Sequence, residues 1–371
     1  MRLDEDAFDA EPLNKDASNG KSTEEPTEFS TSCESSDFLK PYPKSPISAR
    51  NWSKYNNAKT HEKPRFMELL ADLCATVDEL PRPPGAGRNR IFFADMMFAI
   101  VFKVYDKTGG RRFMPELEEA RQKKYITRVP QFNSLFNYLS LSATTDCLYQ
   151  LILASAKPLR GLETMFAVDA TGFSTGQYSR WLSEKDINKV FDQQLTWRKL
   201  HLICGTKTQI VTGVEVTDRH ASDHNSFGPL VTATAGEFNL KAVLADKAYL
   251  SKQNYELVAA VGGRAYIPFK STSKLGDEAR GEVWRSMFYL FHLNKRVFDS
   301  YYNNRVAVES TFSAIKRNYG ERLRSKGGTA QVNEILCKVL CHNICVLIGV
   351  MEDLGIDVDF QRNCSQMGLP S

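Results

Sequence analysis

Three carboxylates stand out by their positions. Two follow short apolar segments, and the third lies in a helical stretch that contains basic residues. Asp169 follows the apolar segment 165–168, Asp246 follows the apolar segment 242–245, and Glu309 lies in a helical stretch among basic residues. Carboxylate oxygens are the ligands that Mg²⁺ and Mn²⁺ prefer, and no His or Cys cluster surrounds these positions to favour zinc. Two such ions about 3.5–4 Å apart activate an attacking hydroxyl and stabilise the leaving oxygen of a phosphodiester. The pattern predicts a divalent-metal site that acts on phosphodiesters.

The residues around Glu309 follow a helical spacing. Tyr302, Arg305, Glu309 and Lys316 are separated by 3, 4 and 7 positions, which places the four side chains on one helical face. A carboxylate between two cations fits a site at which a phosphate lies. The plainer alternative is an ion pair between Arg305 and Glu309, and single aspartates at strand ends often only cap a turn. The three carboxylates in this order, with this spacing, favour the phosphate site.

A sheet is needed to bring these carboxylates together. Apolar segments at 165–168, 201–205 and 210–216 predict three consecutive antiparallel strands. A helical stretch at 227–235, a strand at 242–245, a helix at 252–261 and a strand at 265–269 follow. The order βββαβαβ, followed by long helices, predicts an α/β fold of the ribonuclease H-like type with a mixed sheet. Its first and fourth strands are neighbours, so Asp169 and Asp246, expected at the ends of these strands, converge at one edge.

Helices precede this sheet. Helical periodicity begins near residue 63 and continues in segments at 92–105, 114–123 and 131–139. The last two segments enclose a basic turn and have the size of a helix-turn-helix, whose second helix enters a DNA major groove. An ordinary helical hairpin with a solvated basic turn is the alternative. We expect an all-helical, DNA-binding domain in this half of the chain.

Charge and composition indicate where the domains begin and end. The 371 residues are 42% hydrophobic and 25% charged, an ordinary globular composition that suffices for one large or two modest cores. Residues 1–46 hold 11 acids and 5 bases, whereas the rest of the chain holds 33 acids and 43 bases, a basic body that fits a polyanion partner. We predict a disordered acidic tail at 1–46, a helical domain at 47–159, a catalytic domain at 160–350 and a C-terminal tail at 351–371.

Targeting and redox features indicate a cytoplasmic protein. The acidic start lacks the basic n-region of a signal peptide, and the longest apolar run, 335–351, is interrupted by Lys338, His342 and Asn343. This run predicts a buried helix, not a membrane span. Eight cysteines occur without a Cys-x2-Cys pair, which argues against a zinc ribbon or a disulfide framework.

Other side chains offer weaker sites. Cys337, Cys341 and Cys345 share a helical face but are spread too far along it to bind one zinc ion. Polar residues at 220, 223 and 224 either touch the carboxylate site or form a polar turn, and the turn is the favoured interpretation. Trp284 either stacks on a flipped base or packs in the core, and packing is favoured.

One motif is specific to a family. The segment from Tyr302 to Lys316 reads Tyr-x2-Arg-x3-Glu-x6-Lys and resembles the glutamate-region motif of insertion-sequence transposases of the "four" class, in the D-D-E recombinase superfamily. Residues 168–173 resemble the first-aspartate segment of that family, and residues 245–249 resemble its second. The resemblance covers residues 160–350 and, more loosely, residues 51–159.

The resemblance implies an enzyme that cuts and joins double-stranded DNA at element ends and target sites, without a covalent enzyme intermediate. It implies that Asp169, Asp246 and Glu309 hold Mg²⁺, for which Mn²⁺ substitutes. It also implies a homodimer on DNA in the cytoplasm of a prokaryote, associated with the nucleoid. The residues expected to bind DNA are Tyr302, Arg305 and Lys316, and the bases that follow: Arg317, Arg322, Arg324 and Lys326.

The sequence also leaves rivals open. Only 63 positions separate Asp246 from Glu309, too few for the large β insertion of the best-known relatives, so a hairpin intermediate is not predicted. One rival is a DNA-binding protein or repressor, derived from a transposase, that does not cut. Another is a metal-dependent nuclease that hydrolyses DNA but does not join it.

Overall fold

The strands of the described residues form one mixed sheet. The computed structural model describes residues 39–43, 51–81, 90–175, 197–218, 221–275, 281–358 and 360. In these residues the sheet has the order β3-β2-β1-β4-β5, and β1, β2 and β3 pair antiparallel whereas β1, β4 and β5 run parallel. The strands are β1 (Met165–Ser174), β2 (Trp197–Gly205), β3 (Val211–Asp218), β4 (Ala242–Ala245) and β5 (Arg264–Tyr266). The predicted α/β class with a mixed sheet is confirmed, and it is consistent with a ribonuclease H-like fold.

The first strand is longer than the sequence indicated. We expected it to end at Asp169, but β1 continues to Ser174. Pairing with β4 stops at Val168 and Ala245, while pairing with β2 continues as far as Ser174 and Trp197. Asp169 therefore lies where β1 parts from β4, in the middle of a strand. The prediction was wrong because residues 170–174, which alternate in character and form no apolar run, continue the backbone ladder with β2.

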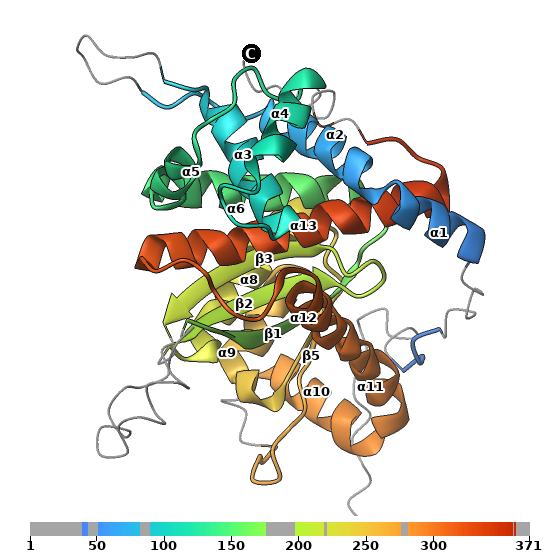
Figure 1. Cartoon of the computed structure of the whole chain (residues 1–371). Helices are drawn as coiled ribbons and strands as arrows, with labels where there is room; N and C mark the ends of the chain where they lie inside the picture. The colour runs from blue at the N-terminus through green and yellow to red at the C-terminus, as the bar shows by residue number, and fades with distance from the viewer. Residues whose placement is uncertain are drawn as a thin grey trace, which may run out of the picture. The chain divides into compact units, whose positions relative to one another are not determined.

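Helices cover both faces of the sheet. In Figure 1, α12 (Val306–Tyr319) lies in front of the sheet and α8 (Asp223–Glu237) lies behind it. Burial of both faces of β4 explains its unbroken sequence Ala-Val-Leu-Ala. The remaining elements beside the sheet are the helices α9 (Lys252–Ala260), α10 (Glu282–Leu293) and α11 (Lys295–Tyr302), and the 3₁₀ turns η1 (Lys157–Leu159), η2 (Lys247–Tyr249) and η4 (Asn303–Arg305).

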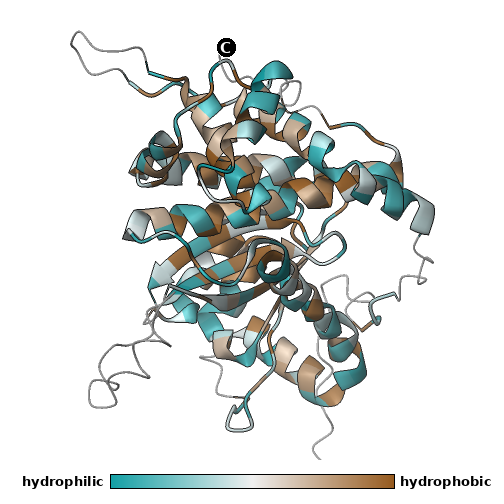
Figure 2. Cartoon of the chain, viewed as in Figure 1, coloured by the Kyte–Doolittle hydropathy of each residue, from teal (hydrophilic) through white to brown (hydrophobic). Residues whose placement is uncertain are grey.

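The long helix α13 (Gly328–Leu354) packs against both the sheet and the helical half of the chain. On one side it contacts β2, β3 and α12, and on the other it contacts helices from the N-terminal half (Figure 1). Those helices are α1 (Trp52–Thr60), α2 (Glu62–Cys74), α3 (Phe93–Asp106), α4 (Met114–Gln122), α5 (Phe132–Leu139) and α6 (Ser142–Ala156), of which α1, α2, α3, α5 and α6 touch α13. Figure 2 shows apolar residues along α13 and the strands.

Three polar residues interrupt the apolar run in α13. Each forms hydrogen bonds with backbone groups of segments that pack against the helix. Asn343 accepts from the amide of Val211 at 2.9 Å and donates to the carbonyl of Val211 at 2.8 Å. A ring nitrogen of His342 lies 2.9 Å from the carbonyl of Gln209. The ammonium of Lys338 donates to two loop carbonyls. Length and composition alone would let α13 span a membrane, but most of it is buried inside the protein, as expected for a core helix.

The helical half shares one compact unit with the sheet. This unit begins at Pro41, whereas Met1–Lys40, of which only the last two residues are described, forms a separate one. The predicted boundary at residue 159 stays a prediction, and the predicted tail at 1–46 lies almost wholly outside the described residues. Between α4 and α5, residues 123–131 form a connection longer than the three or four residues of a helix-turn-helix. The structure therefore favours the ordinary helical pair.

Replacement of Gly205 by alanine is expected to destabilise the fold by about 1–3 kcal/mol. An added Cβ would lie 2.3 Å from the side-chain carboxyl carbon of Glu163. Glu163 is fully buried and accepts bonds from the amide and hydroxyl of Thr208, so it cannot move away without losing them. Urea unfolding measures the loss, and Gly236→Ala, where no atom lies within 4 Å, is the control. Equal midpoints for the two variants would show that the packing is looser than described.

Candidate active site

Two aspartates lie on adjacent parallel strands. Val168 pairs with Ala245, so Asp169 and Asp246 are the next residues on β1 and after β4. Asp246 has extended backbone and directly precedes the 3₁₀ turn η2. The predicted convergence of these two side chains is thus a consequence of the strand register.

Asp169 is a carboxylate in a partly desolvated position. Its side chain is 26% exposed, and it accepts a hydrogen bond from the amide of Ala170 at 2.8 Å. Burial raises its pKa above the ordinary value, and the negative charge of Asp246 adds to this, against the opposing effects of Ala170 and Arg305. A cation at this edge would favour the ionised form.

Arg305 links two of the three predicted carboxylates. Its guanidinium donates to Asp169 at 2.8 Å and forms a second ion pair with Glu309, whose side chain is half exposed. Arg305 is therefore bound to both β1 and α12. The ion pair with Glu309 that was the plainer alternative is present, and the same guanidinium also reaches the sheet.

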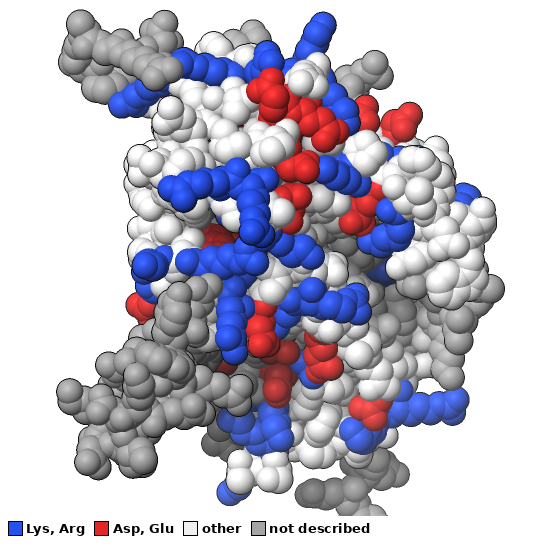
Figure 3. Space-filling model, viewed as in Figure 1, with Lys and Arg blue, Asp and Glu red and all other residues white. Residues whose placement is uncertain are grey.

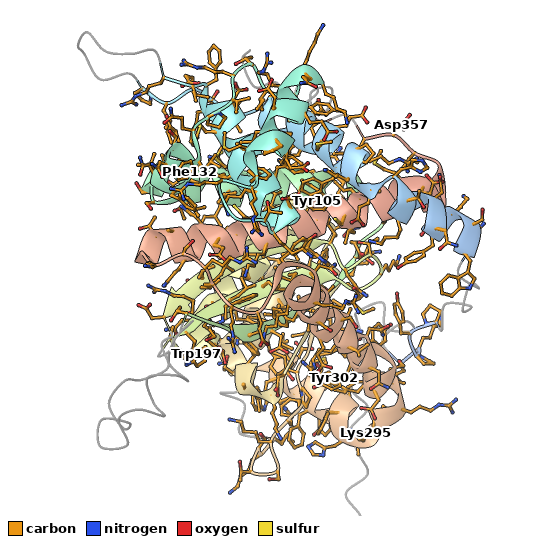
Figure 4. The ribbon with its side chains drawn as sticks, viewed as in Figure 1. Tyr105, Phe132, Trp197, Lys295, Tyr302 and Asp357 are labelled. Atoms are coloured by element: carbon orange, nitrogen blue, oxygen red, sulfur yellow. The ribbon has the colours of Figure 1, made fainter. Side chains whose placement is uncertain are left out.

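Tyr302 and Lys316 flank this link. Lys316 donates to the hydroxyl of Thr171 on β1 at 2.7 Å, and burial lowers its pKa. Tyr302 lies at the end of α11 with its ring 6.0 Å from the guanidinium of Arg305 (Figure 4). Burial raises its pKa, and the charges of Asp246 and Asp169 contribute. The four motif residues therefore share one side of the sheet edge.

The spacing of the motif predicted a single helical face, but the four residues do not lie on one uninterrupted α-helix. Tyr302 ends α11, Arg305 belongs to the 3₁₀ turn η4, and Glu309 and Lys316 lie on α12. The backbone stays in the right-handed helical region across both junctions. The tighter turn changes the local period, yet it leaves Arg305 directed at Asp169.

The other residues predicted to bind DNA lie in different parts of the structure. Arg317, adjacent to Lys316, lines a different pocket beside α1, with Lys59 and Glu62. Arg322, Arg324 and Lys326 are exposed on the segment between α12 and α13. This segment is tied to β1, because the amide of Leu323 donates to the carbonyl of Ser174 at 2.8 Å. The structure brings Arg322 next to the end of β1, places Arg324 and Lys326 beside α3 and α5, and leaves Arg317 in the pocket beside α1.

Tyr249 is a residue near the carboxylates that sequence reasoning missed. Its hydroxyl is buried and has no hydrogen-bond partner among the described residues. Burial raises its pKa, with contributions from the charges of Asp223, Asp169 and Asp246. Its position three residues after Asp246 was a signal, since the 3₁₀ turn places its ring 5.6 Å from that of Phe227 on α8.

The structure shows where most of the weaker candidate residues from the sequence lie. Trp284 is 4% exposed and packs edge-on against Phe269 at 4.9 Å, so it belongs to the core. Asp223 begins α8 and pairs with Lys199, on the α8 side of the sheet. Residue 220 lies outside the described residues. Cys341 is buried and donates to the carbonyl of Val101 at 3.5 Å.

The donor chemistry of the site fits a divalent cation. Asp169 and Asp246 offer hard oxygen donors whose mutual repulsion a cation would relieve. In the described part of the chain, however, no three His, Cys, Asp or Glu side chains converge closely enough to enclose a metal. The guanidinium of Arg305 stands between Asp169 and Glu309. A site with all three carboxylates therefore requires Arg305 to release one of them.

Comparison with known proteins gives one match, to a family model. Residues 160–344 match the family model described as the transposase DDE domain. No curated protein and no solved structure matches the chain. The match spans the sheet, α12 and most of α13, and it includes the two aspartates, Glu309 and the cations beside them. Residues 160–344 of this chain are therefore similar to the DDE domain of transposases.

Proposed function

We propose that this protein is an insertion-sequence transposase of the "four" class that binds terminal inverted repeats and catalyses cleavage and joining of DNA strands. The observation that supports the proposal is the junction of β1, β4 and α12, where Asp169 and Asp246 follow paired strand residues and Arg305 links Asp169 to Glu309, within the segment that matches the DDE domain model. Water attacks the phosphodiester at the element end, and the freed 3′-hydroxyl then attacks target DNA. Assembly as a homodimer would hold two ends, and the cytoplasm of a prokaryote is the proposed compartment.

The side chains divide the work by charge. Asp169, Asp246 and Glu309 would hold divalent cations, which supply activation of the attacking hydroxyl and stabilisation of the leaving oxygen. Arg305 donates two charged hydrogen bonds to carboxylates in the structure, and a DNA phosphate is a competing acceptor for the same guanidinium. Lys316, held against β1 through Thr171, supplies a second cation to the phosphate. A phosphate that captures Arg305 would thus free Glu309.

Arg322, Arg324 and Lys326 extend this surface. Figure 3 shows Lys and Arg side chains gathered over the segment between α12 and α13 and over the helices beside it, with Asp and Glu at the edge of this group. We propose that these cations hold the DNA backbone, and that the helical half contributes to recognition of the repeats. Binding should weaken as salt rises.

The test uses purified protein with Mg²⁺ and a duplex that carries the repeats flanking its gene. Wild type is expected to give nicked and strand-joined products, and Glu309→Gln is expected to bind the duplex but give neither. Omission of Mg²⁺ should have the same effect. Nicked products without joined products would indicate a nuclease. Binding without products in either protein would indicate the second candidate, a DNA-binding repressor derived from a transposase.

A further inference from the structure

A cavity of about 390 Å³ opens between α3, α5 and the segment that joins α12 to α13. Its floor is aliphatic, with Ile100 and Leu135 among its residues, and its wall includes the half-exposed ring of Phe136. Its volume lies in the range of roughly 300–1,000 Å³ that small-molecule sites occupy. None of the three candidate carboxylates lines it, although two of its lining residues, Arg324 and Lys326, belong to the basic segment proposed above to hold the DNA backbone.

Cations surround this apolar cavity. They are Lys103 and Lys107 from α3 and its end, and Arg324 and Lys326 from the segment before α13. The ammonium of Lys103 lies 5.5 Å from the centroid of the Phe136 ring. Within the described ranges, no salt bridge involves Lys103, Lys107 or Lys326. Burial lowers the pKa of Lys103, and the charge of Arg324 adds to this, against the opposing charges of Glu334 and Asp106.

The carboxylate of Glu334 also lines the cavity, and it is bound to the backbone of the basic segment and to Lys338. It accepts from the amides of Arg324 at 2.9 Å and Ser325 at 2.8 Å, and it lies 3.4 Å from the ammonium of Lys338. These contacts fix the basic segment in place before any ligand arrives. A ligand would therefore meet positioned cations, an apolar floor and an exposed aromatic ring.

We propose that this cavity binds a nucleotide, with its phosphate among Lys103, Lys107, Arg324 and Lys326 and its base stacked on Phe136. Cations without carboxylate partners favour a phosphate, and an exposed aromatic ring favours a flat base. The nucleotide comes either from solution or from an unpaired position in a DNA strand. The proposal concerns binding, so it stands or falls independently of strand cleavage.

Isothermal titration calorimetry of the full-length protein tests the free nucleotide. Deoxyadenosine monophosphate is expected to bind at least about tenfold more tightly than deoxyribose 5-phosphate, because only the former can stack. Phe136→Ala should remove this difference, and Lys326→Glu should weaken both ligands. The controls are Phe92→Ala, an exposed phenylalanine outside the cavity, and Lys123→Glu, an exposed lysine at the end of α4.

Fluorescence anisotropy tests the DNA source, with a labelled duplex that carries one unpaired nucleotide and the matching blunt duplex. Tighter binding of the first duplex, lost in Phe136→Ala, would identify a DNA nucleotide as the ligand. Nucleotide binding in solution without this DNA preference would identify a free nucleotide. If deoxyribose 5-phosphate binds as well as the nucleotide, or if Phe136→Ala changes neither assay, the proposal is overturned. Circular dichroism spectra of the variants establish that they are folded.

Discussion

Asp169→Asn is expected to lower the rate of DNA strand cleavage by about a thousandfold or more while the protein stays folded. The amide keeps the shape of the carboxylate, and its oxygen still accepts from Arg305, but it provides no negative charge to a divalent cation. A nicking assay on repeat-bearing duplex, with Mg²⁺ in excess, measures the loss.

The same substitution should not reduce stability at neutral pH. Because burial raises the pKa of Asp169 in the folded protein, the folded state binds the proton more tightly than the unfolded chain. The contribution of this carboxyl to stability therefore falls as pH rises through that pKa, and Asn removes the cost of ionisation. Asp299→Asn, in an exposed ion pair with Lys295, is the control for both assays. Unfolding of Asp169→Asn at 25 °C would make the activity loss uninformative about catalysis and would contradict this account.

Acidification should destabilise the protein through His342 by an amount on the order of 3 kcal/mol. Burial lowers the pKa of this histidine from 6.5 to about 4, and the charge of Lys59 contributes, against the hydrogen bond to Gln209. The unfolded chain therefore binds a proton that the folded protein excludes. The stability that neutral His342 contributes is fully present above pH 6.5, and it is lost progressively as pH falls towards 4. Urea unfolding at intervals across this range measures the slope.

His342→Gln separates this contribution from others. Glutamine still donates to the carbonyl of Gln209 but does not titrate, so the variant should lose less stability between pH 6.5 and 4 than wild type. Some dependence should remain because burial also lowers the pKa of His201. Identical slopes for the variant and wild type would show that the ring of His342 is accessible to solvent.

The positions of the strands along the chain could be predicted from sequence because the buried part of each strand is a short apolar run. The extension of β1 beyond Asp169 could not, since only its backbone ladder with β2 defines it. Helical spacing predicted that Arg305 and Glu309 share one face of a helix. The 3₁₀ turn between α11 and α12 has no signal in this spacing, because it depends on packing. The insertion of Arg305 between Asp169 and Glu309 is likewise a tertiary contact with no local pattern.

Polar residues show the same limit. Lys338, His342 and Asn343 were visible as interruptions of an apolar run, but the backbone groups that they bind lie in distant segments. Tyr249 stood close to Asp246 in the sequence, yet its unpaired hydroxyl can be recognised only once burial is known. The sequence identifies chemistry, whereas burial decides which polar groups are used.

The position of α13 has a consequence for how the protein is made. Both the sheet and the helices of the N-terminal half pack on this helix, which is translated after all of them. Until the ribosome has translated the codons from Gly328 onward, the apolar surfaces of the sheet and of the N-terminal helices that pack against α13 have no partner. We expect nascent chains of this length to require chaperone protection, and we expect messages cut short before α13 to yield degraded fragments, not a smaller working enzyme.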